Sequence, residues 1–208
     1  MKAACTGDHA SDPLLNDEGS PQTTPPQRPD MWTILDMANG PPSAPGWMRM
    51  DDGVMGGVSS STLVYDDTEK CMTFTGHVSL ERNGGFASTR SQSWQGWDFA
   101  EAKGIGLLAK GDGRLYKLSI KTDDAMSAVV YEHDFRPSVG QYQECRLNFK
   151  DFKPTFRGRL VPGSSSLDGS RVRQVGFMCS KLTDSGAAVH GFEPGHFKLD
   201  IRKLSAYK

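Results

Sequence analysis

Several features that mark common protein classes are scarce or missing in this 208-residue sequence. No stretch approaches the ~20 apolar residues that a membrane-spanning helix needs, so we expect no integral membrane segment. The formal net charge is only −1, and no strongly basic field of the kind that attracts DNA is evident. The beginning has no apolar segment after a basic start, and it is neither Arg-rich nor poor in acidic residues. We therefore expect neither a secretory signal nor an ordinary mitochondrial presequence.

Cysteine is also scarce, and its spacing argues against a metal site. The four cysteines are widely separated, with no Cys-x-x-Cys pair: Cys5, Cys71, Cys145 and Cys179. A zinc site would need closer pairs of ligands. The last three lie inside strand-like segments, which predicts free thiols that behave as small buried hydrophobes. A disulfide among them stays open, and we expect no metal ion or cofactor.

Motifs of common enzymes are missing as well. The sequence has no Gly-x-Ser-x-Gly, His-Glu-x-x-His or Walker motif. Residues 104–109 fit a loose Gly-x-Gly-x-x-Ala pattern, but they run into the Asp112-Gly113 turn rather than opening a helix, so we expect a core strand there. In Glu132-His133-Asp134, alternation separates the three side chains, and we expect a partly buried histidine rather than a metal ligand. We expect no catalytic residues and no enzymatic activity.

The first thirty residues differ from the rest in composition. They contain five of the twelve prolines, no aromatic residue, and two basic against five acidic residues. Such a segment buries too little apolar surface to offset the entropy of ordering it. We expect residues 1–30 to be a disordered acidic tail and residues 31–208 to form one domain of the usual size.

The domain reads as many short strands separated by turns. Apolar residues alternate in short windows that we expect to face the core, with no long helical period: Met72, Phe74, Val78 and Leu80; Tyr116, Leu118 and Ile120; Val129, Tyr131, His133 and Phe135; Cys145, Leu147 and Phe149; Val175, Phe177 and Cys179; Phe197, Leu199 and Ile201. This density of strands predicts an all-β sandwich or barrel with few short helices. Two segments, 157–172 and 181–195, are too long for hairpins, and long loops on a rigid scaffold often carry binding function.

One segment, residues 50–61, is both rich in glycine and acidic. It contains Asp51 and Asp52 followed by three glycines within five positions. Glycine permits sharp turns and close approach of other groups, and we expect a Cβ at Gly56 or Gly57 to oppose the backbone shape. The segment is either a structural turn at a sheet margin or a binding loop.

Six motifs in order resemble those of the complex I intermediate-associated protein family. They are Asp51-Asp-Gly-Val-Met-Gly-Gly-Val-Ser59, Phe74-Thr-Gly-His-Val-Ser-Leu80, Asn83-Gly-Gly-Phe-Ala-Ser-Thr-Arg90, Gly111-Asp-Gly-Arg-Leu-Tyr-Lys117, Phe149-Lys-Asp-Phe-Lys-Pro-Thr-Phe-Arg-Gly158 and Val175-Gly-Phe-Met178. Together they span roughly residues 32–207. One departure is Asp51, where the family's motif leads us to expect asparagine.

The resemblance implies a galactose-binding-like β-jelly roll sandwich and a non-catalytic assembly chaperone. The implied partners are assembly intermediates of mitochondrial respiratory complex I and other assembly factors. The signature residues are Gly53, Met55, Gly56, Gly57, Gly84, Gly85, Phe86, Gly113, Tyr116 and Gly158. Polar residues within the matching motifs are our candidates for partner contact: Asp52, Ser59, Arg90, Arg157 and Arg159. Mitochondrial localisation is implied in the same way, with the cytosol or a plastid as alternatives.

Two other functions stay open at this point. This type of jelly roll commonly binds sugars, and Trp94 and Trp97 are the only candidates for an aromatic platform, although as strand residues they would face opposite ways. A plastid-type member would act in photosystem assembly or bind RNA. The basic run from Arg146 to Arg173, with its interleaved phenylalanines, would suit RNA, an acidic protein partner, or simply a solvated face.

Overall fold

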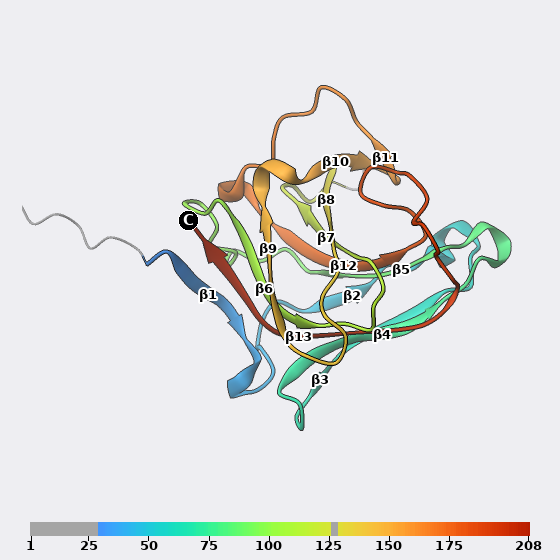
Figure 1. The fold of residues 1–208 in the computed structure, drawn as a ribbon. Helices are drawn as coiled ribbons and strands as arrows, with labels where there is room; N and C mark the ends of the chain where they lie inside the picture. Colours follow the sequence, from blue (N-terminus) through green and yellow to red (C-terminus); the bar gives the residue numbers. More distant parts are fainter. Residues whose placement is uncertain (1–28, 126–128) are drawn as a thin grey trace, which may run out of the picture.

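The computed structural model describes residues 29–125 and 129–208. These residues form two antiparallel sheets packed face to face (Figure 1). They contain no α-helix, only short 3₁₀ segments, and none of their helices has the length and apolar character needed to cross a membrane. The predicted all-β sandwich is confirmed. The predicted acidic tail lies outside the described residues, apart from residues 29 and 30.

The six-stranded sheet has the order β3-β4-β13-β6-β9, and β1 pairs with β13 beside this path. Its strands are β1 (Met31–Asp36), β3 (Ser60–Asp66), β4 (Cys71–Val78), β6 (Gly104–Lys110), β9 (Gln143–Asn148) and β13 (Gly195–Tyr207). The long β13 lies between β4 and β6 and pairs with both.

The seven-stranded sheet has the order β11-β10-β8-β7-β12-β5-β2. Its strands are β2 (Trp47–Arg49), β5 (Phe86–Ser91), β7 (Tyr116–Lys121), β8 (Val130–Phe135), β10 (Lys153–Phe156), β11 (Arg159–Leu160) and β12 (Gln174–Ser180). The 3₁₀ segments are η1 (Met37–Asn39), η2 (Asp52–Met55), η3 (Glu81–Asn83), η4 (Phe149–Asp151) and η5 (Gly169–Arg171).

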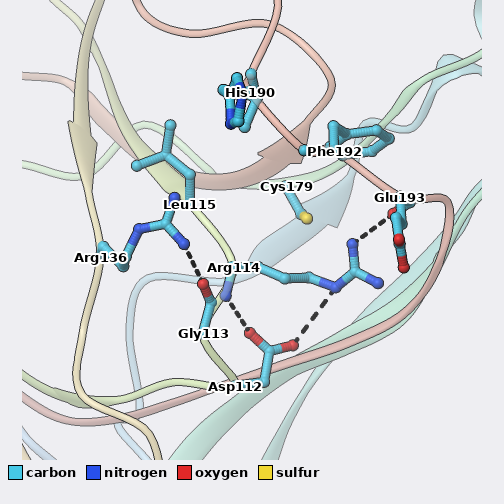
Figure 2. A pocket seen from close by; sticks show the side chains of 11 residues that line it. Asp112, Gly113, Arg114, Leu115, Arg136, Cys179, His190, Phe192 and Glu193 are labelled. Carbon is cyan, nitrogen blue, oxygen red and sulfur yellow. Dashed lines mark hydrogen bonds and ion pairs between the residues drawn. The ribbon is translucent and has the colours of Figure 1, made fainter.

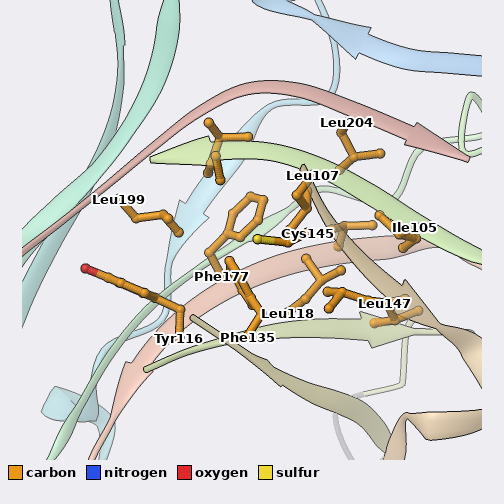
Figure 3. Packing of buried hydrophobic residues seen from close by; sticks show 14 of the residues in the cluster. Ile105, Leu107, Tyr116, Leu118, Phe135, Cys145, Leu147, Phe177, Leu199 and Leu204 are labelled. Carbon is orange, nitrogen blue, oxygen red and sulfur yellow. The ribbon is translucent and has the colours of Figure 1, made fainter. Parts of the chain in front are cut away.

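The core lies between the sheets and follows the alternation of side chains along each strand. Leu107 and Leu147 reach inward from the six-stranded sheet, and Leu118 and Phe177 reach inward from the seven-stranded sheet (Figure 3). Because successive side chains point to opposite faces, the residues between these core positions lie on the outer faces of the sheets. The predicted strand at 104–109 is confirmed as β6.

The structure differs from the strand pattern at three places, where a strand ends before the residues concerned. Leu80 is 45% exposed, since β4 ends at Val78 and the chain turns into η3. Phe149 is buried as predicted but belongs to η4 rather than to a strand. Trp94 and Trp97 do not lie on a strand; their rings pack edge to face at 4.9 Å, and Trp97 is part of the core.

Other predictions about single residues are confirmed. Cys71, Cys145 and Cys179 are buried free thiols, whereas Cys5 lies outside the described residues. His133 is partly buried, with its ring 5.2 Å from that of Phe152 and its Nδ1 2.7 Å from the carbonyl oxygen of Asp134. Of the two predicted long loops, residues 157–172 contain the short strand β11. Residues 181–195 contain an isolated β-bridge between Leu182 and Ala188.

Candidate functional site

The glycine-rich segment folds around the buried carboxylate of Asp52, the first residue of η2. Its Oδ1 accepts a hydrogen bond from the Ser59 amide at 3.0 Å, and its Oδ2 accepts from the Ser59 hydroxyl at 2.6 Å. Oδ2 also accepts from the amide of Gly85 at 2.7 Å. One side chain thus joins the signature segment to the second glycine motif.

Glycines surround this carboxylate because it leaves no space for side chains. A Cβ at Gly57 would lie 2.4 Å from Cγ of Asp52, and a Cβ at Gly84 would lie 2.6 Å from its Oδ2. Gly56 instead has a left-handed backbone, with φ of 88°. The prediction that a Cβ would be opposed at both Gly56 and Gly57 is confirmed, by backbone angle at the first and by close contact at the second.

Asp51 makes a parallel connection one residue earlier. Its Oδ2 accepts from the Ser61 amide at 2.8 Å, and its Oδ1 accepts from the Ser88 amide at 2.8 Å and from the Ser61 hydroxyl at 2.6 Å. Both oxygens therefore face backbone N–H donors. The NH₂ group of an asparagine here would face one of these N–H donors and could not accept its hydrogen bond. A carboxylate, which accepts at both oxygens, therefore suits this position.

Burial alone would raise the pKa of Asp52. The hydrogen bonds from the Ser59 hydroxyl and from the amides of Gly85, Phe86 and Ser59 outweigh burial and hold the pKa below its ordinary value. The carboxylate is therefore ionised at neutral pH, and it acts as an internal acceptor for the chain around it.

The consequence of this internal network is an exposed apolar tip. Val54 and Met55 follow Asp52 in η2 and are 82% and 62% exposed. Surface-exposed apolar residues are common singly, but here two adjacent ones project from a turn whose base is fixed by buried hydrogen bonds. We call Val54 and Met55 the apolar tip.

The apolar tip forms one side of a cleft of about 560 Å³ on the outer face of the seven-stranded sheet. Five of the six sequence motifs contribute residues to it. The cleft is lined by Met50, Val54, Met55, Asn83, Gly84, Gly85, Phe86, Ser88, Arg90, Lys117, Val130, Glu132, Thr155, Arg157, Gly158, Met178, Ser180, Lys181 and Leu182. The turn between β10 and β11 also contributes to the lining, and we call the outer faces of β5, β12, β7 and β8 the floor of the cleft.

The floor contains a row of residues aligned by strand register. In order across β5, β12, β7 and β8, these residues are Arg90, Gly176, Ser119 and Glu132. Each is paired with the next in the strand register. Lys117 donates to Glu132 at 3.0 Å, and both side chains are almost completely buried. This ion pair satisfies the single carboxylate among the described residues that line the cleft.

The charges of the cleft are unbalanced. Four described lining residues are basic, namely Arg90, Lys117, Arg157 and Lys181, against Glu132 alone. Lys117 is paired with Glu132, and Lys181 donates to the carbonyl oxygen of Gly84 at 2.6 Å. The guanidinium groups of Arg90 and Arg157 have no hydrogen bond or ion pair within residues 29–125 and 129–208, although Arg157 lies 5.2 Å from the Phe156 ring.

The structure brings together some of the candidate contact residues and separates others. Arg90 and Arg157 line the same cleft, and Arg159 is exposed on the neighbouring strand β11. Asp52 and Ser59 are buried and bonded to each other, so they support the apolar tip from beneath and offer no free surface. The prediction that Asp52 and Ser59 contact a partner directly is therefore replaced by a supporting role for both residues.

Sequence reasoning missed Lys117, Glu132, Met178 and Lys181. A signal for Lys117 was present, since placing Tyr116 and Leu118 in the core assigns Lys117 to the opposite face. No comparable signal existed for the pairing of Lys117 with Glu132.

A second cavity, of about 310 Å³, lies beside the turn before β7 (Figure 2). Arg114 donates to the carbonyl oxygen of Glu193 at 2.6 Å, and Arg136 donates to that of Gly113. Burial raises the pKa of the Cys179 thiol at the wall to about 12. The arginines of this cavity serve to join neighbouring loops of the protein, so it is a weaker candidate for a site.

Comparison with protein families decides the identity of the domain. A family model described as Complex I intermediate-associated protein 30 (CIA30) matches residues 37–201. The chain belongs to the CIA30 family. All six motifs lie inside the matched range. An uncharacterized protein of Schizosaccharomyces pombe is 35% identical over 173 residues, which cover 76% of this chain and 75% of the relative.

Solved structures similar to this CIA30 domain are carbohydrate-binding modules. The family 11 module of the cellulosomal cellulase Lic26A-Cel5E of Clostridium thermocellum aligns with a TM-score of 0.56 and 16% identity, over 86% of this chain and 95% of the module. A family 11 module from the same organism, in complex with a β-1,3-1,4-mixed-linked tetrasaccharide, aligns at 0.51 and 16% identity, over 78% of this chain and 87% of that one. These likenesses confirm the β-sandwich and concern the fold alone.

Proposed function

We propose that this CIA30-family chain is a non-catalytic binding protein that holds partly assembled respiratory complex I, acting as an assembly chaperone. The family match carries the proposal. We place the contact at the cleft on the seven-stranded sheet, together with the apolar tip and the β10–β11 turn. Mitochondrial localisation and contact with other assembly factors are parts of the same proposal.

The geometry of the cleft supports a binding role. Its walls carry exposed apolar side chains next to unpaired guanidinium groups, a combination typical of protein recognition surfaces. The base of the apolar tip is fixed by Asp52, so little conformational entropy is lost when the apolar tip is covered. A binding surface of this kind requires no reacting group.

The thiols of Cys145 and Cys179 are poorly suited to nucleophilic catalysis, which agrees with a binding role. Burial raises the pKa of the thiols of Cys145 and Cys179, and a buried thiol with a raised pKa is a poor nucleophile. The His133 ring packs against that of Phe152, and its Nδ1 lies 2.7 Å from the carbonyl oxygen of Asp134.

The fold likeness to carbohydrate-binding modules gives less support to a sugar-binding role. Sugar sites use exposed aromatic rings as platforms. Trp97 is in the core and Trp94 packs against it. Phe86 is the one aromatic residue among the described residues that line the cleft. We therefore treat glycan binding as an outcome that the experiment distinguishes.

The test is affinity purification of the tagged full chain from its native cells, with mass spectrometry of the proteins that co-purify. Subunits of complex I should be enriched over an untagged control, in native-gel fractions smaller than the finished complex. Cell fractionation should place the tagged chain in mitochondria. Enrichment of photosystem, ribosomal or glycosylated proteins without complex I subunits would overturn the proposal.

A further inference from the structure

We infer that the cleft receives an acidic segment of a partner protein, with one carboxylate on Arg90 and flanking apolar side chains on Val54 and Met55. This inference rests on the proposed function, because it names the kind of polypeptide that the same cleft would hold.

Arg90 makes no hydrogen bond or ion pair with a described residue, and its attraction to the nearby Glu132 only partly offsets the burial of its guanidinium. Its guanidinium is partly buried, and Glu132, the nearby carboxylate, is bound to Lys117 at 3.0 Å. A desolvated cation without a partner is costly. A guanidinium offers parallel N–H groups that match a carboxylate in geometry, so an incoming Asp or Glu side chain would remove this cost.

At the position opposite Arg90, β12 has no bulky side chain, and the small hydroxyl of Ser119 lies close by. Gly176 is opposite Arg90 in the register and has no side chain of its own. A Cβ there would lie 2.6 Å from Oγ of Ser119, so the position is restricted to glycine by its neighbours. The next outward-facing residue of β12, Met178, supplies an apolar surface in the same cleft. A carboxylate and a neighbouring apolar group therefore both find a matching surface.

A protein segment fits these features better than a membrane does. Arg90 lines the floor of the cleft and is partly buried, whereas Val54 and Met55 project into solvent. A flat bilayer resting on the apolar tip would not reach the floor. A polypeptide side chain that protrudes into the cleft would reach Arg90 while its neighbours cover the apolar tip.

The experiment is site-specific photo-crosslinking of the full chain in its native cells. Benzoylphenylalanine replaces Met55 beside the cleft, or Val64 on the other sheet as a control position, each in the parent and in R90Q. Crosslinks from position 55 should reach a segment containing Asp or Glu. In R90Q their yield should fall about tenfold or more, the loss expected for a charge-assisted hydrogen bond, while crosslinks from position 64 are unchanged.

Two further variants make the result independent of any folding defect in R90Q. Replacing the carboxylate of the crosslinked segment by its amide leaves this chain intact and should reduce the yield as R90Q does. R171Q removes an exposed cation outside the cleft and should have no effect.

Each outcome decides the inference. A yield that R90Q and the partner's amide variant leave unchanged, a crosslinked segment without a carboxylate, or crosslinks mainly to lipid or glycan would overturn it. If the segment is acidic and depends on Arg90 but belongs to a protein unrelated to complex I, the inference stands and the proposed function fails. If a complex I subunit crosslinks with a yield that does not depend on Arg90, the proposed function stands and the inference fails.

Discussion

The carboxylate of Asp52 determines the local structure of the whole signature segment. Donors from Ser59 and Gly85, which are far apart in the sequence, converge on its two oxygens. Gly57 and Gly84 lack side chains where this carboxylate lies. The acidic residue and the glycines of the motif therefore form one structural unit, and substitutions at either should disturb the same turn.

We predict that D52N lowers stability in a way that depends on pH. Hydrogen bonds hold the pKa of Asp52 below its ordinary value, so the ionised form favours folding above about pH 4 and this contribution is lost as the pH falls through the lowered pKa. Urea unfolding at about pH 7 should show a loss of about 2 kcal/mol in D52N, and the difference from the parent should shrink below about pH 4. A difference that stays constant with pH would contradict this explanation.

We predict that G57A is destabilising and that G53A is not. A Cβ at Gly57 meets the carboxylate of Asp52 at 2.4 Å, whereas a Cβ at Gly53 has no atom within 4 Å and its φ is not positive. G57A should lose about 1–3 kcal/mol in unfolding free energy, and G53A should stay within about 0.5 kcal/mol of the parent. Equal stability of the two variants would show that the turn is merely flexible.

At the scale of strands, β7 and β8 are joined across the cleft floor by a buried ion pair. Lys117 and Glu132 are 3.0 Å apart, and burial leaves both nearly without water. A buried pair of this kind adds little net stability, but the loss of one member leaves an uncompensated charge.

We predict that K117M costs about 3 kcal/mol or more in unfolding free energy, because it leaves the Glu132 carboxylate buried without its partner. The double variant K117M/E132M removes both charges and should recover most of this loss. Denaturant unfolding of the parent, the single variant and the double variant measures the effect. A double variant that is less stable than K117M would show that Glu132 has another essential partner.

Two residues of η2, Val54 and Met55, should matter for the proposed function but not for the stability of the fold. Val54 and Met55 contribute little to the core because they face solvent. We predict that V54D/M55D changes unfolding free energy by no more than about 0.5 kcal/mol and yet strongly reduces co-purification of partner proteins. V64D, at an exposed apolar position on the other sheet, is the matched control and should leave co-purification unchanged. If V54D/M55D fails to fold, Val54 and Met55 are needed for stability, and the claim that they serve only binding is wrong.

For the whole molecule, the sequence predicts the strands better than it predicts the site. Period-2 patterns locate β7, β12 and the first half of β13, because each strand has one face in the core. The cleft depends instead on strand order. Arg90 and Arg157 line one cleft because β12, β7 and β8 lie between β5 and β10 in the sheet and bring these two strands to its two sides. This order follows from long-range pairing, which no local pattern encodes.

The sequence motifs also left the depth of each residue undetermined. Asp52 and Arg90 are both charged residues in glycine-rich motifs, yet one is buried beneath the surface and the other lines the cleft. The burial of Asp52 depends on contacts such as the hydrogen bond from the Gly85 amide, which join distant parts of the sequence and leave no local pattern.

The most direct measurement of the central proposal is the amount of assembled complex I in cells that lack this chain and express a variant in its place. Native gels would compare the parent, the cleft variant V54D/M55D/R90Q and the control variant V64D/R171Q, each checked for a normal thermal unfolding midpoint. We expect the parent and the control to restore complex I, and the cleft variant to leave assembly intermediates unfinished. Full restoration by a folded cleft variant would contradict the proposal.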